Sequence, residues 1–382
     1  MRTTRRAPAL LGLFYCMVLG LVLGSLLGLA GCSGSSNPAA QSAIRNYNGT
    51  ASVGDFLTIT INSTALTISY KNYTNGDTGI VPYTVNANGT YAITDPNGNL
   101  VAAYEVPGSV LMVETNKSGP SHNTPALITA IESTPASIAT FAGRNFNYLQ
   151  FRTSSGGLGF GTIAIDAQGN VTHDGFWPYG ETQQPADLFD GGTFAATSVQ
   201  EDPTGDFFTI TEGNGETSTA FGTQNGFFAV DTANGTILGL PKASSKNFNS
   251  SNAGTYTAVF YKKPNAQMTQ NGESGTPVEG NATITISASG VLTITDSQNN
   301  TLATGTLAAV ADTSYLYDGT QNTLPDPCFG MFTIRTTTGN SQQDVFVSFQ
   351  GNAVIFASFK TALPFQTNGN ATYTYFYGVG VS

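Results

Sequence analysis

Charged residues, cysteine and histidine are scarce in this chain of 382 residues. Only 10% of the residues are charged, and there are three cysteines, two histidines and one tryptophan. So few Glu, Lys and Arg residues are not typical of a coiled coil or a helical bundle. The 40% hydrophobic and 11% aromatic residues are too many for a disordered chain. The abundant residues are Thr (53), Gly (44) and Asn (31), a composition that favours β-strands joined by tight turns.

The N-terminal segment carries the most specific motif. Three arginines within the first six residues precede an uncharged stretch rich in Leu, Val and Gly, which ends in Leu29-Ala30-Gly31-Cys32. This arrangement resembles the signal of bacterial lipoproteins. The resemblance implies that residues 1–31 are a signal peptide cut before Cys32, and that Cys32 carries a diacylglycerol and an N-linked acyl chain such as palmitate. The alternative is a plain transmembrane helix, because residues 10–30 are long enough to span a bilayer.

The residues after the cysteine predict a tether and a location. Residues 33–41 read Ser-Gly-Ser-Ser-Asn-Pro-Ala-Ala-Gln, a composition typical of flexible linkers, so we assign 32–44 to the lipidated cysteine and its tether. Two or three acyl chains make such an anchor stable. Ser33, rather than Asp, follows Cys32, which resembles the outer-membrane sorting pattern. The expected location is therefore the bacterial cell envelope, at the outer membrane.

The remaining charges and cysteine limit the partners and the source of stability. All 24 acidic residues lie after Cys32, whereas three of the 14 basic residues precede it, so a chain cut there has a net charge of −13. Such a chain lacks the basic surface that nucleic acid and anionic lipid headgroups require. Cys328 is the sole cysteine after Cys32, which excludes an internal disulfide, and we interpret it as a buried thiol.

Period-2 alternation dominates the sequence and predicts an all-β fold. Leu57, Ile59 and Ile61 alternate with threonines, and the segments 345–349 and 373–381 alternate in the same way. Gly and Asn residues between such runs mark hairpin turns. The middle third contains eight short strand patterns, which suits a small up-and-down barrel. A six- or seven-bladed β-propeller is the alternative, since 161–171 resembles one strand pair of an NHL-type repeat, and β-sandwich modules are a third possibility.

Recurrent segments suggest three modules, at 45–141, 142–250 and 251–382. The second and third begin with Ala142-Gly143 and Ala253-Gly254, each followed by an aromatic strand. A glycine before an aromatic strand resembles the start of lipocalin-like barrels, although the Gly-x-Trp of that family is missing. The strongest internal match relates 85–99 to 286–300. The predicted architecture is therefore a tandem of small antiparallel β-barrels of the lipocalin-like kind.

No catalytic or cofactor motif stands out, so the chain is interpreted as a non-enzyme, with no cofactor and no metal expected. His122 and His173 are isolated, and neither lies near Cys328 in the sequence. The acidic segment 201–206 could hold calcium, but it lacks the regular spacing of a calcium loop, and an acidic turn between strands explains it equally well. No glycine-rich phosphate loop precedes a helix.

The loop that contains Phe176, Trp177 and Tyr179 is the candidate ligand-binding segment. Aromatic rings beside a proline can form a platform for a glycan or an apolar small ligand, although such rings can also simply cap a barrel. The leading hypothesis is a lipid-anchored binding or structural module. The alternatives are a secreted polysaccharide hydrolase that uses Asp174 and Glu181, and a passive adhesin or scaffold. The oligomeric state is not predicted.

Overall fold

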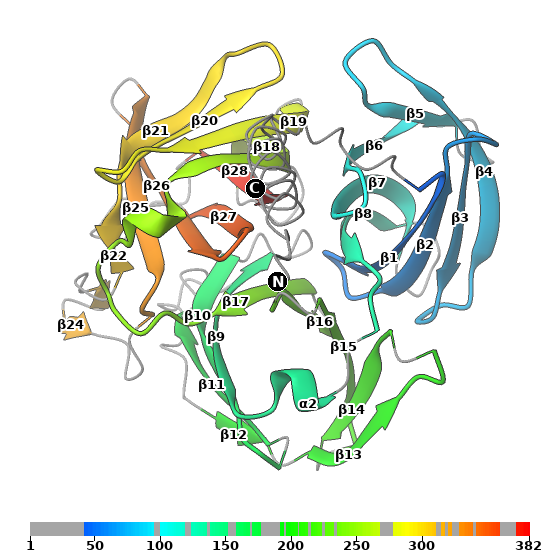
Figure 1. Cartoon of the computed structure of the whole chain (residues 1–382), viewed down its shortest axis with the longest axis horizontal. Coiled ribbons are helices and arrows are strands. Elements are labelled where there is room, and N and C mark those ends of the chain that lie inside the picture. The colour runs from blue at the N-terminus through cyan, green and yellow to red at the C-terminus, as the bar shows by residue number, and fades with distance from the viewer. Residues whose placement is uncertain are drawn as a thin grey trace, which may run out of the picture. The chain divides into compact units, whose positions relative to one another are not determined.

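Antiparallel β-strands make up nearly all of the regular structure that the computed structural model describes (Figure 1). The described residues are 42–382 except 95–99, 119–123, 136–137, 152–157, 169, 177–191, 195, 205, 213–214, 224–225, 233–234, 268–277, 311–314, 318–319, 323–327, 339–340 and 360–371. The predicted signal peptide and Cys32 lie outside them. Among the described residues, no helix has the length and hydropathy needed to cross a membrane.

The first eight strands form a closed barrel in which each strand pairs with the next, and β1 pairs with β8. Inward positions carry the alternating apolar residues, such as Ile59, Ile61 and Ile128, that form the interior of this barrel. The strands are β1 (Ile44–Ala51), β2 (Phe56–Asn62), β3 (Thr67–Asn72), β4 (Thr78–Val85), β5 (Tyr91–Thr94), β6 (Leu100–Val106), β7 (Val110–Ser118) and β8 (Thr124–Glu132).

The second sheet is also an up-and-down meander whose first and last strands, β9 and β17, pair with each other. The helix α2 (Ile138–Phe141) precedes it, and the buried ring of Phe141 packs into its interior. The strands are β9 (Arg144–Phe151), β10 (Leu158–Ile165), β11 (Val171–Phe176), β12 (Gly192–Phe194), β13 (Ala196–Glu201), β14 (Phe208–Glu212), β15 (Thr217–Gly222), β16 (Phe228–Thr232) and β17 (Gly235–Pro241).

The third sheet follows the 3-10 helix η1 (Ser250–Asn252) and repeats this plan, with β18 paired to β28. A separate hairpin of β23 (Tyr315–Tyr317) and β24 (Thr320–Asn322) is inserted between its strands. The strands are β18 (Gly254–Gln267), β19 (Val278–Ile286), β20 (Val291–Asp296), β21 (Thr301–Thr306), β22 (Ala308–Ala309), β25 (Met331–Thr338), β26 (Ser341–Gln350), β27 (Ala353–Phe359) and β28 (Thr372–Val381).

In each sheet the pairing partner changes from the third strand to the fifth at the position of the fourth strand. In the first barrel, residues 78–82 of β4 pair with β3 and residues 83–85 pair with β5. In the second sheet, β12 pairs with β11 and β13 pairs with β14, although one residue separates the two strands. In the third, β21 pairs with β20 and β22 pairs with β25, with Leu307 between them. The first sheet is thus closed through an undivided β4, whereas the second and third are nine-stranded, barrel-like sheets whose two edge strands together take the place of the fourth strand. We refer to the three sheets as the first, second and third barrel.

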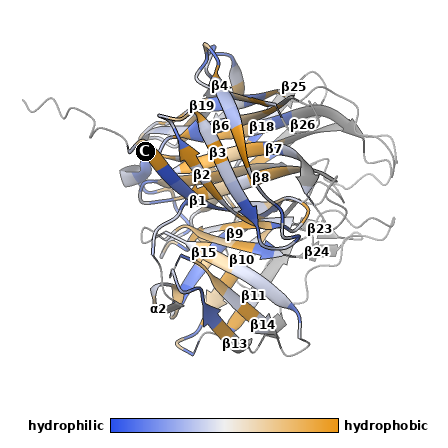
Figure 2. Ribbon diagram, turned by 90° about the vertical axis from the view of Figure 1, so that its right-hand side faces the viewer, coloured by the Kyte–Doolittle hydropathy of each residue, from blue (hydrophilic) through white to orange (hydrophobic). Residues whose placement is uncertain are grey.

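Hydrophobic and hydrophilic residues are interspersed along many strands (Figure 2), and buried hydrophobic residues occur on both faces of several of them. One face fills the barrel interior, and the other joins a cluster contributed by all three barrels, which we call the shared core. In β27, for example, Val354 and Phe356 face the third barrel's interior, whereas Ala353, Ile355 and Ala357 belong to the shared core. Other members of the shared core are Tyr104, Met112, Leu149, Phe151, Val259 and Tyr377.

The contacts between barrels follow one cyclic pattern. Strand β1 contacts β16 and β17 of the second barrel, β9, β10 and β17 contact β26 or β27 of the third, and β18, β19 and β28 contact β6 or β7 of the first. An aromatic ring on the sixth strand of one barrel meets the second strand of the preceding barrel in each case. The three pairs are Phe221 with Phe56, Phe346 with Phe160, and Tyr104 with Gly280.

The prediction of an all-β fold with tandem small antiparallel barrels is confirmed, and the described strands do not form the alternative propeller. Residues 43–382 form one unit, so the division into separate modules at 45–141, 142–250 and 251–382 stays a prediction. The internal match of 85–99 to 286–300 does not relate equivalent strands. It relates the turn after the fourth strand of the first barrel to the turn after the second strand of the third.

Candidate ligand cavity in the first barrel

The residues singled out in the sequence mostly fall outside the described residues. Cys32, Trp177 and Tyr179 lie outside them, as do His122 and Glu181. Phe176 is the last residue of β11, and its backbone lies opposite Phe160; His173 and Asp174 are also in β11. The aromatic-loop hypothesis and the hydrolase alternative therefore stay predictions.

Two other candidates can be placed. Cys328 is fully buried in the shared core, which agrees with its interpretation as a buried thiol. A carboxylate oxygen of Asp202 accepts hydrogen bonds from the backbone N and the Oγ1 of Thr204, at 2.9 and 2.6 Å, as expected for an acidic turn. No group of three or more His, Cys, Asp or Glu residues in the described parts of the chain is arranged to hold a metal ion.

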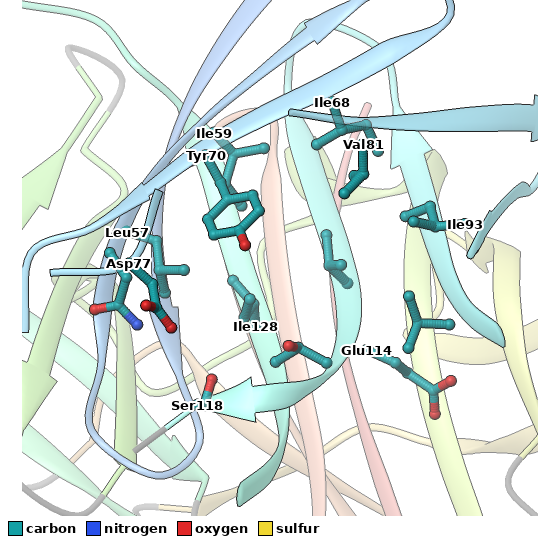
Figure 3. A pocket seen from close by; sticks show the side chains of 14 residues that line it. Leu57, Ile59, Ile68, Tyr70, Asp77, Val81, Ile93, Glu114, Ser118 and Ile128 are labelled. Atoms are coloured by element: carbon teal, nitrogen blue, oxygen red, sulfur yellow. The ribbon is translucent and has the colours of Figure 1, made fainter. Parts of the chain in front are cut away.

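A cavity of about 90 Å³ lies inside the first barrel (Figure 3). Its apolar wall consists of inward-facing aliphatic residues from strands β2 to β8, and Tyr70 of β3 lines the cavity beside them. The aliphatic residues are Leu57, Ile59, Ile68, Val81, Ile93, Val101, Val113 and Ile128. An engineered apolar cavity of about 150 Å³ admits benzene, so this cavity takes a narrower group, such as an alkyl segment of about four or five carbons.

The cavity opens on one side, because several lining residues are only half-buried. In Figure 3, Asp77 lies beside Leu57 on one side of the cavity, whereas the Glu114 side chain points away from it on the other side. Tyr70 reaches across its cross-strand partner Gly79, where a Cβ would lie 2.8 Å from the ring. A side chain at position 79 would therefore displace Tyr70 from this mouth.

The interior of the barrel also holds a charged residue pair with two tyrosines. The Arg45 guanidinium donates to both carboxylate oxygens of Glu105, at 2.7 and 2.8 Å. The hydroxyl groups of Tyr47 and Tyr91 also donate to Glu105. Hydrogen bonds to Glu105 raise the pKa of Arg45, and burial near this carboxylate raises the pKa of both tyrosines. The guanidinium of Arg45 therefore stays charged.

The sequence analysis missed this network, although a signal for it exists. Arg45 is two residues from the inward-facing Tyr47, and Glu105 is two residues from the inward-facing Ala103, so each charged side chain shares the inward face of its strand. A charged residue at an inward position of an amphipathic strand needs a partner, because burying an unpaired charge is costly. The sequence could not pair two residues that are 60 positions apart.

Two further carboxyl groups lie where barrels meet. Asp231 of the second barrel accepts a hydrogen bond of 2.7 Å from the Thr50 hydroxyl of the first. Glu279 of the third barrel forms a hydrogen bond with Glu114 of the first, next to Tyr104. Burial raises the pKa of each to about 8; Asp55 adds to the shift of Asp231, and Glu114 adds to that of Glu279. Both groups are thus protonated in the folded protein at neutral pH.

This protonation predicts that stability falls as the pH rises. The pKa of Glu279 is about 8 in the folded chain and near 4.5 in an unfolded one, so its contribution is fully present below about pH 4.5 and is lost as the pH rises through 8. We expect Glu279→Gln to raise the Tm at pH 9 by a few degrees relative to the parent protein and to change it little at pH 4.5. Calorimetry at both pH values measures this.

The control is Glu201→Gln, which removes an exposed carboxylate of β13 and should have no pH-dependent effect on the Tm. Asp231 has the same direction of shift, so part of the decline persists in the Glu279→Gln variant. A Tm difference between parent and variant that is the same at pH 4.5 and pH 9 would contradict the proton-sharing between Glu279 and Glu114.

Comparisons with known proteins give little similarity. No protein-family model matches the chain, and no curated protein matches it. Two mutant forms of transferrin binding protein B from Haemophilus parasuis Hp5 are each 9% identical. They cover 89% and 86% of this chain and 76% and 66% of their own, with TM-scores of 0.28 and 0.31. A mosquitocidal holotoxin is 11% identical over 89% of this chain and 52% of its own, with a TM-score of 0.16. Values this low establish neither common descent nor a shared function.

Proposed function

We propose that this is a lipid-anchored protein of the bacterial envelope, and that its first barrel binds the apolar part of a small ligand. The observation that carries the binding proposal is the cavity inside β1–β8, whose wall is aliphatic and whose mouth is polar. Small-molecule sites commonly combine an apolar wall with a few polar groups that orient the ligand. The interiors of the other two barrels, like that of the first, carry clusters of buried hydrophobic side chains.

The lining residues fit binding better than catalysis. Among the described residues that line the cavity, Ser118 is the one fully buried hydroxyl nucleophile, and none of them is a histidine, lysine or cysteine that could act on it. Burial of an alkyl group gives about 0.8 kcal/mol per methylene, so four or five carbons supply a useful part of a binding free energy. We therefore propose a binding role rather than an enzymatic one.

Binding can be tested at the isoleucines of the cavity wall. We expect 1-pentanol to shift the methyl NMR signals of Ile59, Ile68, Ile93 and Ile128 saturably, and to leave those of Ile284 and Ile294 in the third barrel unchanged. Val101→Phe places a ring in the cavity and should weaken binding at least tenfold. Val291→Phe makes the same change at an exposed valine and should leave binding intact.

The following results would contradict the binding proposal. If 1-pentanol shifts no cavity isoleucine, or shifts the isoleucines of the first and third barrels alike, the first barrel has no selective site. If binding survives Val101→Phe unchanged while the variant remains folded, the ligand occupies some other part of the protein.

The anchoring part of the proposal is supported by the motif Leu29-Ala30-Gly31-Cys32 and by the tether that follows it. We expect Cys32→Ser to abolish incorporation of radiolabelled palmitate and to leave the precursor uncut. Cys16→Ser is the matched control, because Cys16 lies inside the predicted signal peptide and should be dispensable. Normal processing of the Cys32→Ser chain would refute lipid anchoring without affecting the cavity. The platform of Phe176, Trp177 and Tyr179 is a separate proposal, which Trp177→Ala tests.

A further inference from the structure

Exposed aliphatic side chains gather at one end of the first barrel. Because this barrel is an up-and-down meander, β1, β3, β5 and β7 all begin at the same end. Ile44, Leu66 and Val85 lie there and are 53%, 43% and 55% exposed. Ile44 pairs with Asn62, and the backbone N of Tyr83 donates to the carbonyl of Leu66, so the three residues lie on neighbouring strands and turns. We call this end the tether-side rim, which comprises residues 43–44, 62–67, 85–90, 106–110 and 132–133.

Leu66 has a backbone conformation that its residue type does not favour. Its φ is 53°, in the left-handed region where Gly or Asn is usual. The Asn62 side chain organises this turn by accepting hydrogen bonds from the backbone N of Thr64 and of Ala65. The leucine side chain remains exposed, so packing within the protein does not account for a leucine at this position. An apolar partner outside the chain would account for it.

The tether-side rim is also nearly free of charge. Among its residues, all of which the structure describes, Glu132 is the one charged side chain. The side chains of Arg45 and Glu105 lie just inside the rim, but they are buried against each other. At the opposite end of the barrel, Lys71 and Asp77 flank the β3–β4 turn. The two ends of the barrel therefore differ both in charge and in exposed apolar surface.

The chain enters the first barrel at this same rim. Eleven residues, 33–43, separate Cys32 from Ile44, and a fully extended chain of this length reaches about 40 Å. A strand of the length of β1 spans about 27 Å, so the opposite end of the barrel lies farther from the point of attachment. An acylated Cys32 thus keeps the tether-side rim, rather than the opposite end, closest along the chain to the bilayer.

We propose that the tether-side rim of the first barrel rests on the lipid bilayer that holds the anchor, with Ile44, Leu66 and Val85 among the headgroups of zwitterionic phospholipids. The inference rests on the anchoring part of the proposed function and adds an oriented lipid contact to it. Apolar side chains gain free energy when they leave water, and amphipathic surfaces settle about 5–10 Å into the headgroup boundary. Because the rim has no Lys or exposed Arg, the contact does not need anionic lipid.

This orientation directs the ligand cavity away from the membrane. The polar lining residues Asn72, Thr115 and Ser118 lie at the ends of β3 and β7, opposite the tether-side rim. Between the cavity and the rim, the Arg45 guanidinium and the Glu105 carboxylate are joined by two hydrogen bonds inside the barrel. The end that rests on lipid is therefore the plugged end, and a ligand enters from the aqueous side.

The test measures how close each part of the barrel lies to the lipid headgroups. The full chain, as its host processes it, is placed in phosphatidylcholine nanodiscs that contain a phospholipid with a nitroxide on its headgroup. A fluorescent label is attached at Ala87→Cys on the rim or at Ile80→Cys on the wall, since Cys328 is buried and does not compete. Ile80 lies about 17 Å along β4 from Val85, so we expect the nitroxide to quench the label at position 87 at least threefold more strongly.

Two acidic substitutions test the aliphatic contact itself. In the chain labelled at position 87, Leu66→Glu should reduce the quenching by at least half, and Val85→Glu should do the same at a second rim position. Ile80→Glu is the matched control, because it adds the same charge at a more exposed aliphatic residue outside the rim. It should leave the quenching unchanged.

Other outcomes would overturn the lipid contact. Equal quenching at positions 80 and 87 of an anchored chain would refute the orientation and leave lipid anchoring intact. Quenching that survives in both Leu66→Glu and Val85→Glu would refute the role of the aliphatic residues. Emission at position 87 that changes with the number of chains per nanodisc, without quenching by lipid, would assign the rim to a second copy. A chain that the nanodiscs do not retain would refute the anchoring, and this inference with it.

Discussion

Replacing Glu105 with alanine is expected to destabilise the protein by about 3–5 kcal/mol, because the change leaves the Arg45 guanidinium inside the first barrel without a counter-charge. The side chains of Arg45 and Glu105 are only 7% and 1% exposed. Tyr47 and Tyr91 would lose their acceptor at the same time. Urea unfolding, followed by circular dichroism, measures the loss as a lower midpoint.

The third barrel offers a matched control. Arg335 and Asp344 form a pair of the same geometry, but the Arg335 side chain is 55% exposed. Asp344→Ala leaves that guanidinium in water and should cost about 0–1 kcal/mol. Equal losses in the two variants would contradict the role assigned to burial. The double variant Arg45→Met/Glu105→Leu should recover much of the loss, though not all of it, since two tyrosine hydroxyls remain without Glu105.

Replacing Tyr377 with alanine should be similarly costly, and its effect should reach all three barrels. The Tyr377 ring is fully buried and stacks on Phe151 of the second barrel, with ring centroids 4.9 Å apart. Truncating such a ring costs about 3–5 kcal/mol. Because the shared core takes residues from every barrel, we expect calorimetry to show one unfolding transition that moves to lower temperature as a whole.

Phe332→Ala is the control for this second prediction. Phe332 stacks on Phe349 inside the third barrel, so it contacts no other barrel through that pair. If the barrels unfold together, both variants shift the same single transition. If the barrels are independent, Phe332→Ala lowers one transition among several, and the idea of a cooperative shared core is wrong.

The sequence predicted the class of fold because alternation reports on single strands. Leu57, Ile59 and Ile61 point into the first barrel, and Val345 and Val347 point into the third, as their period-2 spacing indicates. Two alternating residues of the last strand do not point into the interior of their own barrel. Tyr377 and Val379 face the shared core instead of the barrel interior. Alternation thus identifies an apolar face but does not say which neighbour covers it.

The cavity could not be predicted, for a different physical reason. Its wall is built from ordinary core residues such as Ile59 and Ile128, which have the same spacing as core residues of the third barrel. Whether inward side chains meet depends on strand register and on how side chains from opposite strands fill the interior. Asp77 and Glu114 also become neighbours of one cavity only through the folding of strands far apart in the chain.

The cyclic order of contacts separates the spatial arrangement of the barrels from their order along the chain. Two of the contacts join barrels that are consecutive in the sequence, and the third joins the last barrel to the first. Every barrel thereby presents its first strand to one neighbour and its sixth or seventh strand to another, as subunits do in a closed head-to-tail ring. A circularly permuted chain that began with the third barrel would give each barrel the same two neighbours. The order of the barrels along this chain is therefore one of three cyclic orders that are compatible with the same contacts.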